Sequence, residues 1–134
     1  VLFNRSYSPD IQIDSMEMTA SNIYSTPAET TLPLRWIGIM SGRVNTDLAA
    51  STGVHTGEGA IKQILAGAQV VQLASTLYKN GINQVSVIRD ELLAWMEKKG
   101  FASLDEFRGK MASDNNENPA VYERVQFMKH FSGK

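Results

Sequence analysis

The chain has 134 residues, a formal net charge of −1 and no cysteine. The balanced charge argues against nucleic acid or an anionic membrane as partners, and the lack of cysteine excludes disulfides, thiolate metal ligands and thiol catalysis in this stretch. No apolar run reaches the length of a membrane span, so we expect a cytoplasmic protein. We also predict no metal site.

The first third of the chain predicts a strand, a hairpin and a helix. Val1–Asn4 reads as a buried strand, and a chain that opens inside a strand predicts a missing N-terminal part. Alternation at 11–13 and 16–18, around Asp14-Ser15, predicts a small hairpin. Thr26-Pro27-Ala28-Glu29 has the cap, proline and acid of a first helical turn. Because Pro33 interrupts that turn, we expect the full helix from about Pro33 to Arg43, with its core face at Leu34, Ile37 and Met40 or Val44.

Two further strands bracket a helix between Asp47 and Gly81. Leu48–Ser51 predicts the first strand, about Gly57–Ala68 the helix, and Val70–Thr76 the second strand. Small residues follow each strand, and such residues let backbone N–H groups approach a ligand closely. Two such loops at the carboxyl ends of successive parallel strands are typical of the phosphate site of a (β/α)8 barrel. The sequence therefore predicts a phosphate-bearing ligand near Thr52–Val54 and Ala74–Thr76.

The C-terminal part predicts helices only. Residues 83–99 form the strongest helical pattern, which Gly100 ends, and Ser103-Leu104-Asp105-Glu106 predicts a capped short helix to about Met111. Asp114–Asn118 reads as a linker and Pro119–Phe131 as a helical tail. The order of elements predicts an α/β fold, the C-terminal part of a TIM (β/α)8 barrel with three parallel strands and alternating helices. We place the barrel portion at 1–112 and the linker with its tail at 113–134.

Several stretches carry a family resemblance that covers nearly the whole chain. The longest are Leu32-Pro33-Leu34-Arg35-Trp36-Ile37, Ala49-Ala50-Ser51-Thr52-Gly53-Val54-His55-Thr56 and Leu65-Ala66-Gly67-Ala68-Gln69-Val70-Val71-Gln72-Leu73-Ala74-Ser75. Residues 2–5, 8–11 and 118–124 add to them. Together they resemble the C-terminal portion of the dihydroorotate dehydrogenase family, class 1, in its dihydroorotate dehydrogenase-like branch.

The resemblance implies a flavoenzyme that binds FMN at the carboxyl ends of the barrel strands. Such an enzyme oxidises a dihydropyrimidine, dihydroorotate to orotate, in pyrimidine biosynthesis. Two loops of the family hold the FMN phosphate. The Gly-Gly pair of the first loop matches Thr52-Gly53, which Val54 follows. The Gly-Thr pair of the second loop matches Ala74-Ser75. Asn4 matches an asparagine that binds the pyrimidine. The family's catalytic base and its flavin-contacting lysine lie on earlier strands, so the chain by itself is expected to be inactive.

Each of these residues also has a structural interpretation. Asn4 could be a satisfied polar group at a strand end, Thr52-Gly53 the turn of any strand-to-helix join, and Ser75 a helix N-cap. We expect His55 to be a structural hydrogen-bonding residue. The methionines read as core-filling residues.

Besides an enzyme, the sequence leaves a second function class open, and it also predicts an association between chains. The alternative to an oxidoreductase fragment is a non-catalytic module of the same ancestry, a partial barrel that binds a phosphate compound or associates with itself. Open strand edges and an uncovered sheet face predict a homo-oligomer, or association with the missing N-terminal part. The expected contacts are Leu2, Leu48, Ala50, Val71 and Leu73.

Overall fold

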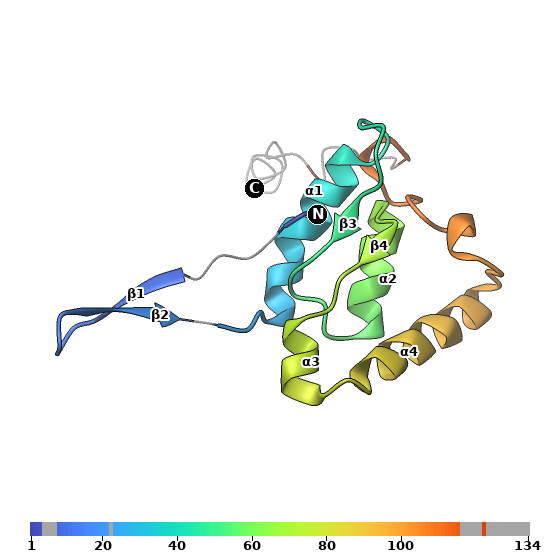
Figure 1. Ribbon diagram of the computed structural model, residues 1–134. Coiled ribbons are helices and arrows are strands. Elements are labelled where there is room, and N and C mark those ends of the chain that lie inside the picture. The colour runs from blue at the N-terminus through green and yellow to red at the C-terminus, as the bar shows by residue number, and fades with distance from the viewer. Residues whose placement is uncertain (4–7, 22, 116–121, 123–134) are drawn as a thin grey trace, which may run out of the picture.

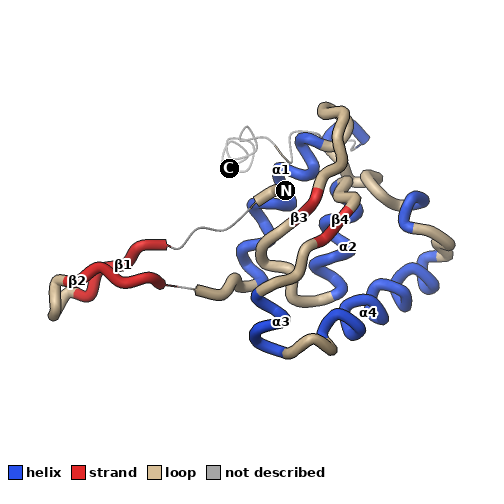
Figure 2. Tube along the Cα trace, viewed as in Figure 1, coloured by secondary structure: helices blue, strands red, loops and turns tan. Residues whose placement is uncertain are grey.

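A computed structural model describes residues 1–3, 8–21, 23–115 and 122. It is a mixed helix and strand structure in which helices flank a short parallel sheet, with a two-stranded hairpin set apart from them (Figures 1 and 2). The predicted tail at 119–131 lies outside the described residues apart from Tyr122, and Asn4 lies outside them entirely. No helix in the described ranges is long and apolar enough to cross a membrane.

The parallel sheet is shorter than predicted. β3 (Ala49–Ala50) pairs with β4 (Val70–Val71), with Ala49 opposite Val70 and Ala50 opposite Val71. In place of a third strand, the described residues contain a single parallel bridge from Leu2 to Ala50. Leu2 N–H donates to the Ala49 carbonyl at 2.8 Å, and the Ser51 N–H donates to the Leu2 carbonyl at 2.9 Å. The prediction of three full parallel strands is therefore not confirmed.

The hairpin was predicted correctly, with longer strands. β1 (Ser8–Gln12) and β2 (Glu17–Ser21) run antiparallel around a turn at residues 13–16. It projects from the rest of the molecule as an arm (Figure 1). The prediction that the methionines fill the core is wrong here, because Met16 is 86% and Met18 69% exposed.

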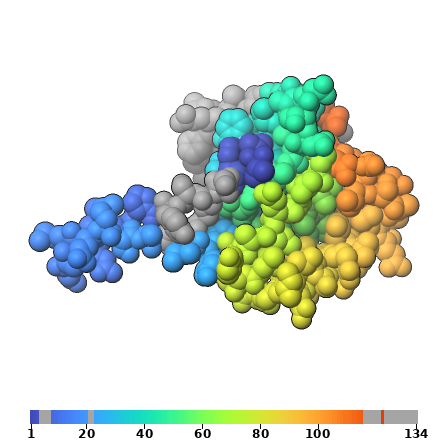
Figure 3. Space-filling model, in the orientation of Figure 1, coloured from blue at the N-terminus to red at the C-terminus, as the bar shows by residue number. Residues whose placement is uncertain are grey.

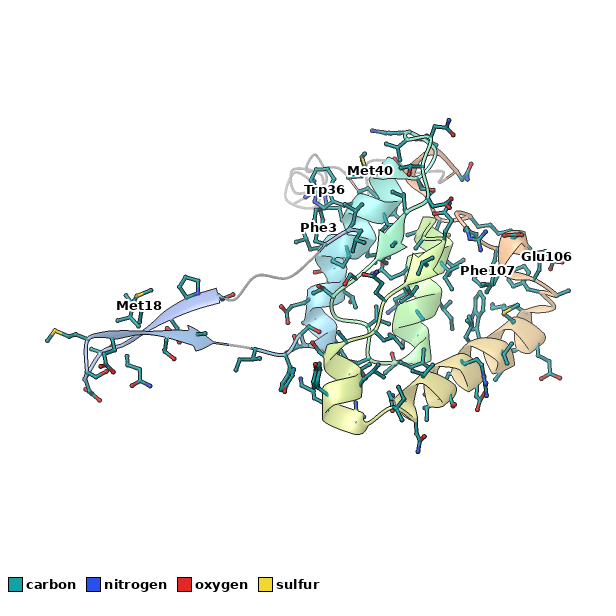
Figure 4. The ribbon with its side chains drawn as sticks, viewed as in Figure 1. Phe3, Met18, Trp36, Met40, Glu106 and Phe107 are labelled. Carbon is teal, nitrogen blue, oxygen red and sulfur yellow. The ribbon has the colours of Figure 1, made fainter. Side chains whose placement is uncertain are left out.

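The first helix begins earlier than predicted. A 3-10 turn, η1 (Pro27–Thr30), is held by a hydrogen bond from the Thr26 N–H to Glu29 Oε2 at 2.6 Å. It continues directly into α1 (Thr31–Met40), so Pro33 does not interrupt the helix. Proline is tolerated in a first turn, where its missing N–H has no intrahelical partner. Ile37 is fully buried, and Trp36 meets Phe3 edge to face at 6.3 Å between ring centroids (Figure 4).

The helix α2 (Gly57–Ala66) follows its prediction closely. Thr56 Oγ1 accepts the Gly59 N–H at 3.2 Å as N-cap, and Gly67 ends the helix with a φ of 118°. A Cβ at Gly67 would clash with Ser41 Oγ, so this position requires glycine for two independent reasons. The helix α2 contributes one buried residue to each of three core clusters. Ala66 packs with Ile37, Leu48, Ala50 and Ala68. Ala60 and Ile64 belong to the other two clusters. Leu48 and Ala50 were predicted as contacts between chains, but they are only 8% and 0% exposed, so that part of the prediction is wrong.

A helix that was not predicted follows β4. The run Val70–Thr76 was expected to be a strand, but pairing stops at Val71 and α3 (Ser75–Asn80) begins four residues later. The next helix, α4 (Gln84–Lys99), matches its prediction, and Gly100 ends it with a φ of 74°. It lies across α2 (Figure 1).

The segment after α4 is less helical than predicted. The expected helix from Ser103 to Met111 is only a 3-10 turn, η2 (Leu104–Glu106), and Ser103 makes no side-chain cap. Phe107, which Figure 4 labels, is fully buried. Its ring centroid lies 5.0 Å from that of Trp95 and 5.3 Å from that of Phe101, and we attribute the shorter helix to this packing. A second 3-10 turn, η3 (Ser113–Asn115), lies at the expected start of the linker.

Candidate functional site

The two predicted loops lie at the same edge of the sheet. The first runs from Ser51 to Thr56 after β3, and the second from Gln72 to Ala74 between β4 and α3. Because β3 and β4 are parallel neighbours, their carboxyl ends lie together, and so do the loops that follow (Figure 1). The predicted loop arrangement is thus present even though the strands are short.

The first loop has an unusual backbone. Thr52 and Gly53 both have positive φ angles, 82° and 79°. Such an angle is uncommon for a β-branched residue and needs support from its surroundings. Thr52 receives it from a 3.0 Å hydrogen bond that its Oγ1 donates to the Phe3 carbonyl. A Cβ on Gly53 would lie 2.5 Å from the Thr30 nitrogen, so the glycine is required for close packing against η1.

Ser25 links the two loops. Its side chain accepts a hydrogen bond from the Gly53 N–H at 3.2 Å, and its backbone N–H donates to Ser75 Oγ at 2.9 Å. Ser25 Oγ also lies 3.3 Å from His55 Nε2. Only 4% of Ser25 is exposed. Sequence reasoning missed this residue, because its partners are 28 to 54 positions away and its own neighbours carry only the signal of a helix start.

Lys79 brings a positive charge to this position. Its Nζ donates to the Ser25 carbonyl at 3.1 Å and lies 6.0 Å from the centroid of the Tyr24 ring. One ammonium group has three donors, so this bond leaves others for a ligand. We call Ser25, His55, Ser75 and Lys79, together with the Gly53 N–H, the polar cluster.

The predicted site residues occupy different positions around this cluster. Gly53 and Ser75 take part in it directly. Val54 is 4% exposed and packs in the core with Ala60 and Ile88, so it can offer a ligand only its backbone. Ala74 is exposed, and Ser75 is the first residue of α3, whose N-cap position is Ala74. The interpretation of Ser75 as N-cap is therefore wrong by one residue.

His55 is the structural residue that the sequence predicted. Besides its contact with Ser25, its carbonyl accepts a hydrogen bond from Gln84 Nε2 at 3.1 Å, which ties the loop to α4. A serine beside a histidine also raises the question of nucleophilic catalysis. The buried Ser25 hydroxyl already accepts a backbone N–H, and none of the hydrogen bonds described for His55 goes to a carboxylate. The pair is therefore a structural contact.

An apolar pocket adjoins the polar cluster at α3. Its volume is about 390 Å³, and Leu73, Ala74, Leu77, Tyr78 and Ile82 line it. Tyr78 stacks on Tyr24 with ring centroids 5.6 Å apart. Since Tyr24 directly precedes Ser25, the same short segment borders the pocket and builds the cluster. It is a wide, open depression of the surface, which we call the α3 pocket.

The cluster has the chemistry of an anion site. Two hydroxyl groups, an ammonium group and the Gly53 N–H lie around Ser25, and donors of this kind bind phosphate oxygens. No Asp or Glu is among the residues that hydrogen-bond with the cluster's side chains in the described part of the chain. The described residues also contain no group of His, Asp and Glu suited to a metal ion.

Known proteins similar to this chain carry a consistent name. No protein-family model matches the chain. It is 48% identical over 59 residues to "Probable dihydroorotate dehydrogenase A (fumarate)" of Streptococcus pneumoniae, a match that covers 44% of this chain and 19% of that protein. It is 39% identical over 61 residues to "Dihydroorotate dehydrogenase (fumarate)" of Lachancea kluyveri, covering 46% of this chain and 19% of that protein.

Solved structures support the same relationship at the level of the fold. The ferulenol complex of DHODH from Eimeria tenella matches 81% of this chain and 29% of its own, with a TM-score of 0.61 and 20% identity. The ligand-free form of that protein matches 76% of this chain and 30% of its own, with a TM-score of 0.58 and 25% identity. DHODH is a TIM-barrel enzyme. The matched part thus spans about a fifth of the relatives' length, and over that part the resemblance to dihydroorotate dehydrogenases, which are oxidoreductases, is confirmed.

Proposed function

We propose that this chain is part of an FMN-dependent dihydroorotate dehydrogenase barrel and contributes to the site that holds the FMN phosphate. The named relatives support the activity, and the parallel arrangement of Leu2, β3 and β4 supports a partial barrel. The reaction would be oxidation of dihydroorotate to orotate in the cytoplasm. Asn4, which lies outside the described residues, is our candidate for binding the pyrimidine.

The observation that carries the proposal is the convergence of donors at the polar cluster. A phosphate group bound there would meet backbone N–H groups of Thr52–Val54 and Ala74–Ser75, the Ser75 hydroxyl, and the Lys79 ammonium, whose charge is opposite to its own. The residues present therefore fit the phosphate end of FMN. When bound, the flavin supplies the hydride acceptor, and this chain's residues hold and orient it.

Ser25 gives the site a further property. Its Oγ already accepts the Gly53 N–H at 3.2 Å, so a phosphate oxygen would have to share or replace that contact. The Gly53 N–H therefore has a partner in the absence of a ligand, which avoids the cost of a buried unpaired N–H.

One observation favours the non-catalytic alternative. Packing against Thr30 explains why position 53 is a glycine, and the Ser25 hydroxyl already accepts the Gly53 N–H. Neither feature requires a ligand. A module with this geometry could serve as a partial barrel that binds phosphate weakly or binds another chain. Flavin affinity separates the two functions.

The test is an FMN titration of the chain, in which quenching of the flavin fluorescence reports binding. We expect Lys79→Met to weaken FMN binding about tenfold, since a hydrogen bond to a charged group contributes roughly 1.5 kcal/mol or more. Lys99→Met is the matched control, because Lys99 lies exposed at the end of α4, away from the cluster. Riboflavin lacks the phosphate and should bind the unmodified chain and Lys79→Met equally.

A second pair of variants tests the hydroxyl group. Ser75→Ala should weaken FMN binding, whereas Ser86→Ala, an exposed serine on α4, should leave it unchanged. No measurable FMN affinity, or equal loss in the Lys79 and Lys99 variants, would refute the phosphate site and leave the non-catalytic module. We also expect no dihydroorotate oxidation by the isolated chain, since the catalytic base implied by the resemblance lies outside it.

A further inference from the structure

Helix α4 presents one stripe of side chains to the first loop and to the start of α2. Gln84, Ile88 and Glu91 are four and three positions apart, a spacing that places them on one face of a helix. Gln84 Nε2 donates a hydrogen bond to the His55 carbonyl at 3.1 Å. Glu91 Oε2 accepts the Gly57 N–H at 2.5 Å. Two residues of α4 thus bind the backbone of the loop within three consecutive positions.

Ile88 lies between these two hydrogen bonds and adds an apolar contact. It is 6% exposed and belongs to the same core cluster as Val54 in the loop and Ala60 in α2. The backbones also approach closely, because a Cβ at Gly57 would clash with Glu91 Cβ and would lie 3.1 Å from the Ile88 carbonyl oxygen. The end of the first loop is therefore packed directly against α4, with no room for a side chain at position 57.

The first loop needs such support. Thr52 and Gly53 have φ angles of 82° and 79°, and a backbone held in a sparsely populated region persists only where its surroundings fix it. The Phe3 carbonyl and the Ser25 hydroxyl hold the first half of the loop, and α4 holds the second half. A loop fastened on both sides keeps its N–H groups in place before a ligand arrives, which lowers the cost of binding.

The position of α4 is itself fixed by both of its ends. Near its C-terminal end, Met96 is 7% exposed and packs with Ile64 and the fully buried Phe107. Its N-terminal end follows α3, which carries Ser75 and Lys79. The two helices are in contact and follow one another along one edge of the body (Figures 1 and 3). The helix that holds the first loop is therefore also the neighbour of the second half of the polar cluster.

We propose that Gln84 and Glu91 are positioning residues of the phosphate site. They hold the first loop so that its N–H groups and the donors of α3 face the same phosphate group. This inference rests on the proposed function. It also assigns the Gly57 N–H to Glu91, whose carboxylate is favourable at the N-terminus of α2, and leaves the ligand the N–H groups of Thr52–Val54.

The charge of Glu91 gives the inference a distinctive sign. A carboxylate near an anion site repels the anion, so its removal would by electrostatics alone strengthen phosphate binding. The positioning role predicts the opposite. When the loop is released, the apparent dissociation constant rises by the reciprocal of the fraction of molecules that keep it in place.

The first test is the FMN titration of variants that lose a hydrogen-bonding group at similar size. Glu91→Met should weaken FMN binding about tenfold and Gln84→Met about threefold, since a hydrogen bond to a charged group contributes more than a neutral one. Riboflavin, which lacks the phosphate, should bind these variants and the unmodified chain equally. Glu91→Gln keeps an oxygen that accepts the Gly57 N–H and should bind FMN nearly as well as the unmodified chain. Glu97→Met and Gln12→Met change exposed residues and are the matched controls.

The second test needs no flavin. Hydrogen exchange of the Gly53 amide, measured by NMR on the folded chain, reports whether the loop is held. Its own partner is the Ser25 hydroxyl, so it responds to α4 only through the loop. We expect exchange to be about tenfold faster in Glu91→Met and about threefold faster in Gln84→Met, and unchanged in both controls. Unchanged Gly53 exchange in both variants would overturn the inference, even if they unfold at a lower urea concentration.

The outcomes separate this inference from the proposed function. If the unmodified chain binds no FMN, the phosphate site is refuted, while Gly53 exchange still decides whether α4 holds the loop. If the chain binds FMN and Glu91→Met binds it equally or more tightly, the site stands and the positioning role is refuted. Glu91→Gln binding as weakly as Glu91→Met would also overturn that role, because the hydrogen bond would then not be what acts.

Discussion

Replacing Ser25 by alanine should destabilise the chain through one buried hydrogen bond. The substitution removes the acceptor of the Gly53 N–H, while the Ser75 and Lys79 contacts survive because they go to the Ser25 backbone. Gly53 is buried, and a buried N–H without a partner costs about 1–3 kcal/mol. Loss of the contact to His55 Nε2, at 3.3 Å, adds to this.

Urea unfolding followed by circular dichroism measures the effect. With an m-value of roughly 2 kcal/mol/M, the midpoint should fall by about 0.5–1.5 M at unchanged m. The control Ser86→Ala changes an exposed serine and should stay within about 0.5 kcal/mol of the unmodified chain. A Ser25→Ala midpoint equal to that of the control would show that the hydrogen bond from the Gly53 N–H to the Ser25 hydroxyl does not stabilise the fold.

Three further changes test particular backbone and charge features. Gly67→Ala should lower the melting temperature more than Gly81→Ala does. Both glycines have a positive φ, but only at Gly67 would the added Cβ meet a neighbouring atom, Ser41 Oγ. Thr52→Ala should be about 1 kcal/mol less stable than Thr52→Gly in urea unfolding, since both lose the bond to Phe3 but only glycine relieves the φ of 82°. The hydrogen bond and charge of Lys62 lower the pKa of the Glu58 carboxyl below 4.5. The pair therefore stabilises α2 above that pH and ceases to do so as the pH falls through the lowered pKa, and Lys62→Met should restore the ordinary value in an NMR titration.

Local interactions explain which elements could be predicted. The hairpin follows from alternation, and α2 and α4 from apolar periodicity with Thr56, Gly67 and Gly100 at their ends. These signals act within a few residues of one another, so the sequence contains them in full. The strand ends and α3 depend on distant partners. Val70–Thr76 reads as a strand, yet Thr76 is fully buried as part of a six-residue helix.

The candidate site divides in the same way. The loops were predictable because small residues follow each strand, and Gly53 and Ser75 do meet there through Ser25. Ser25 and Lys79 were not predictable, because a serine before a helix start and a lysine on a short helix have many possible surroundings. Only the fold brings Tyr24 and Ser25 against α3.

The position of Lys79 leads to a last prediction, that phosphate stabilises the chain through this one charge. A ligand that binds only the folded state raises the free energy of unfolding by mass action. Inorganic phosphate should therefore raise the urea midpoint relative to chloride at equal ionic strength, which holds screening constant. Phosphate also stabilises proteins in general through exclusion from their surface, so Lys99→Met, which changes an exposed lysine at the end of α4, gives that background. Lys79→Met should gain less stability from phosphate than Lys99→Met does, whereas equal gains in both variants would place the anion elsewhere.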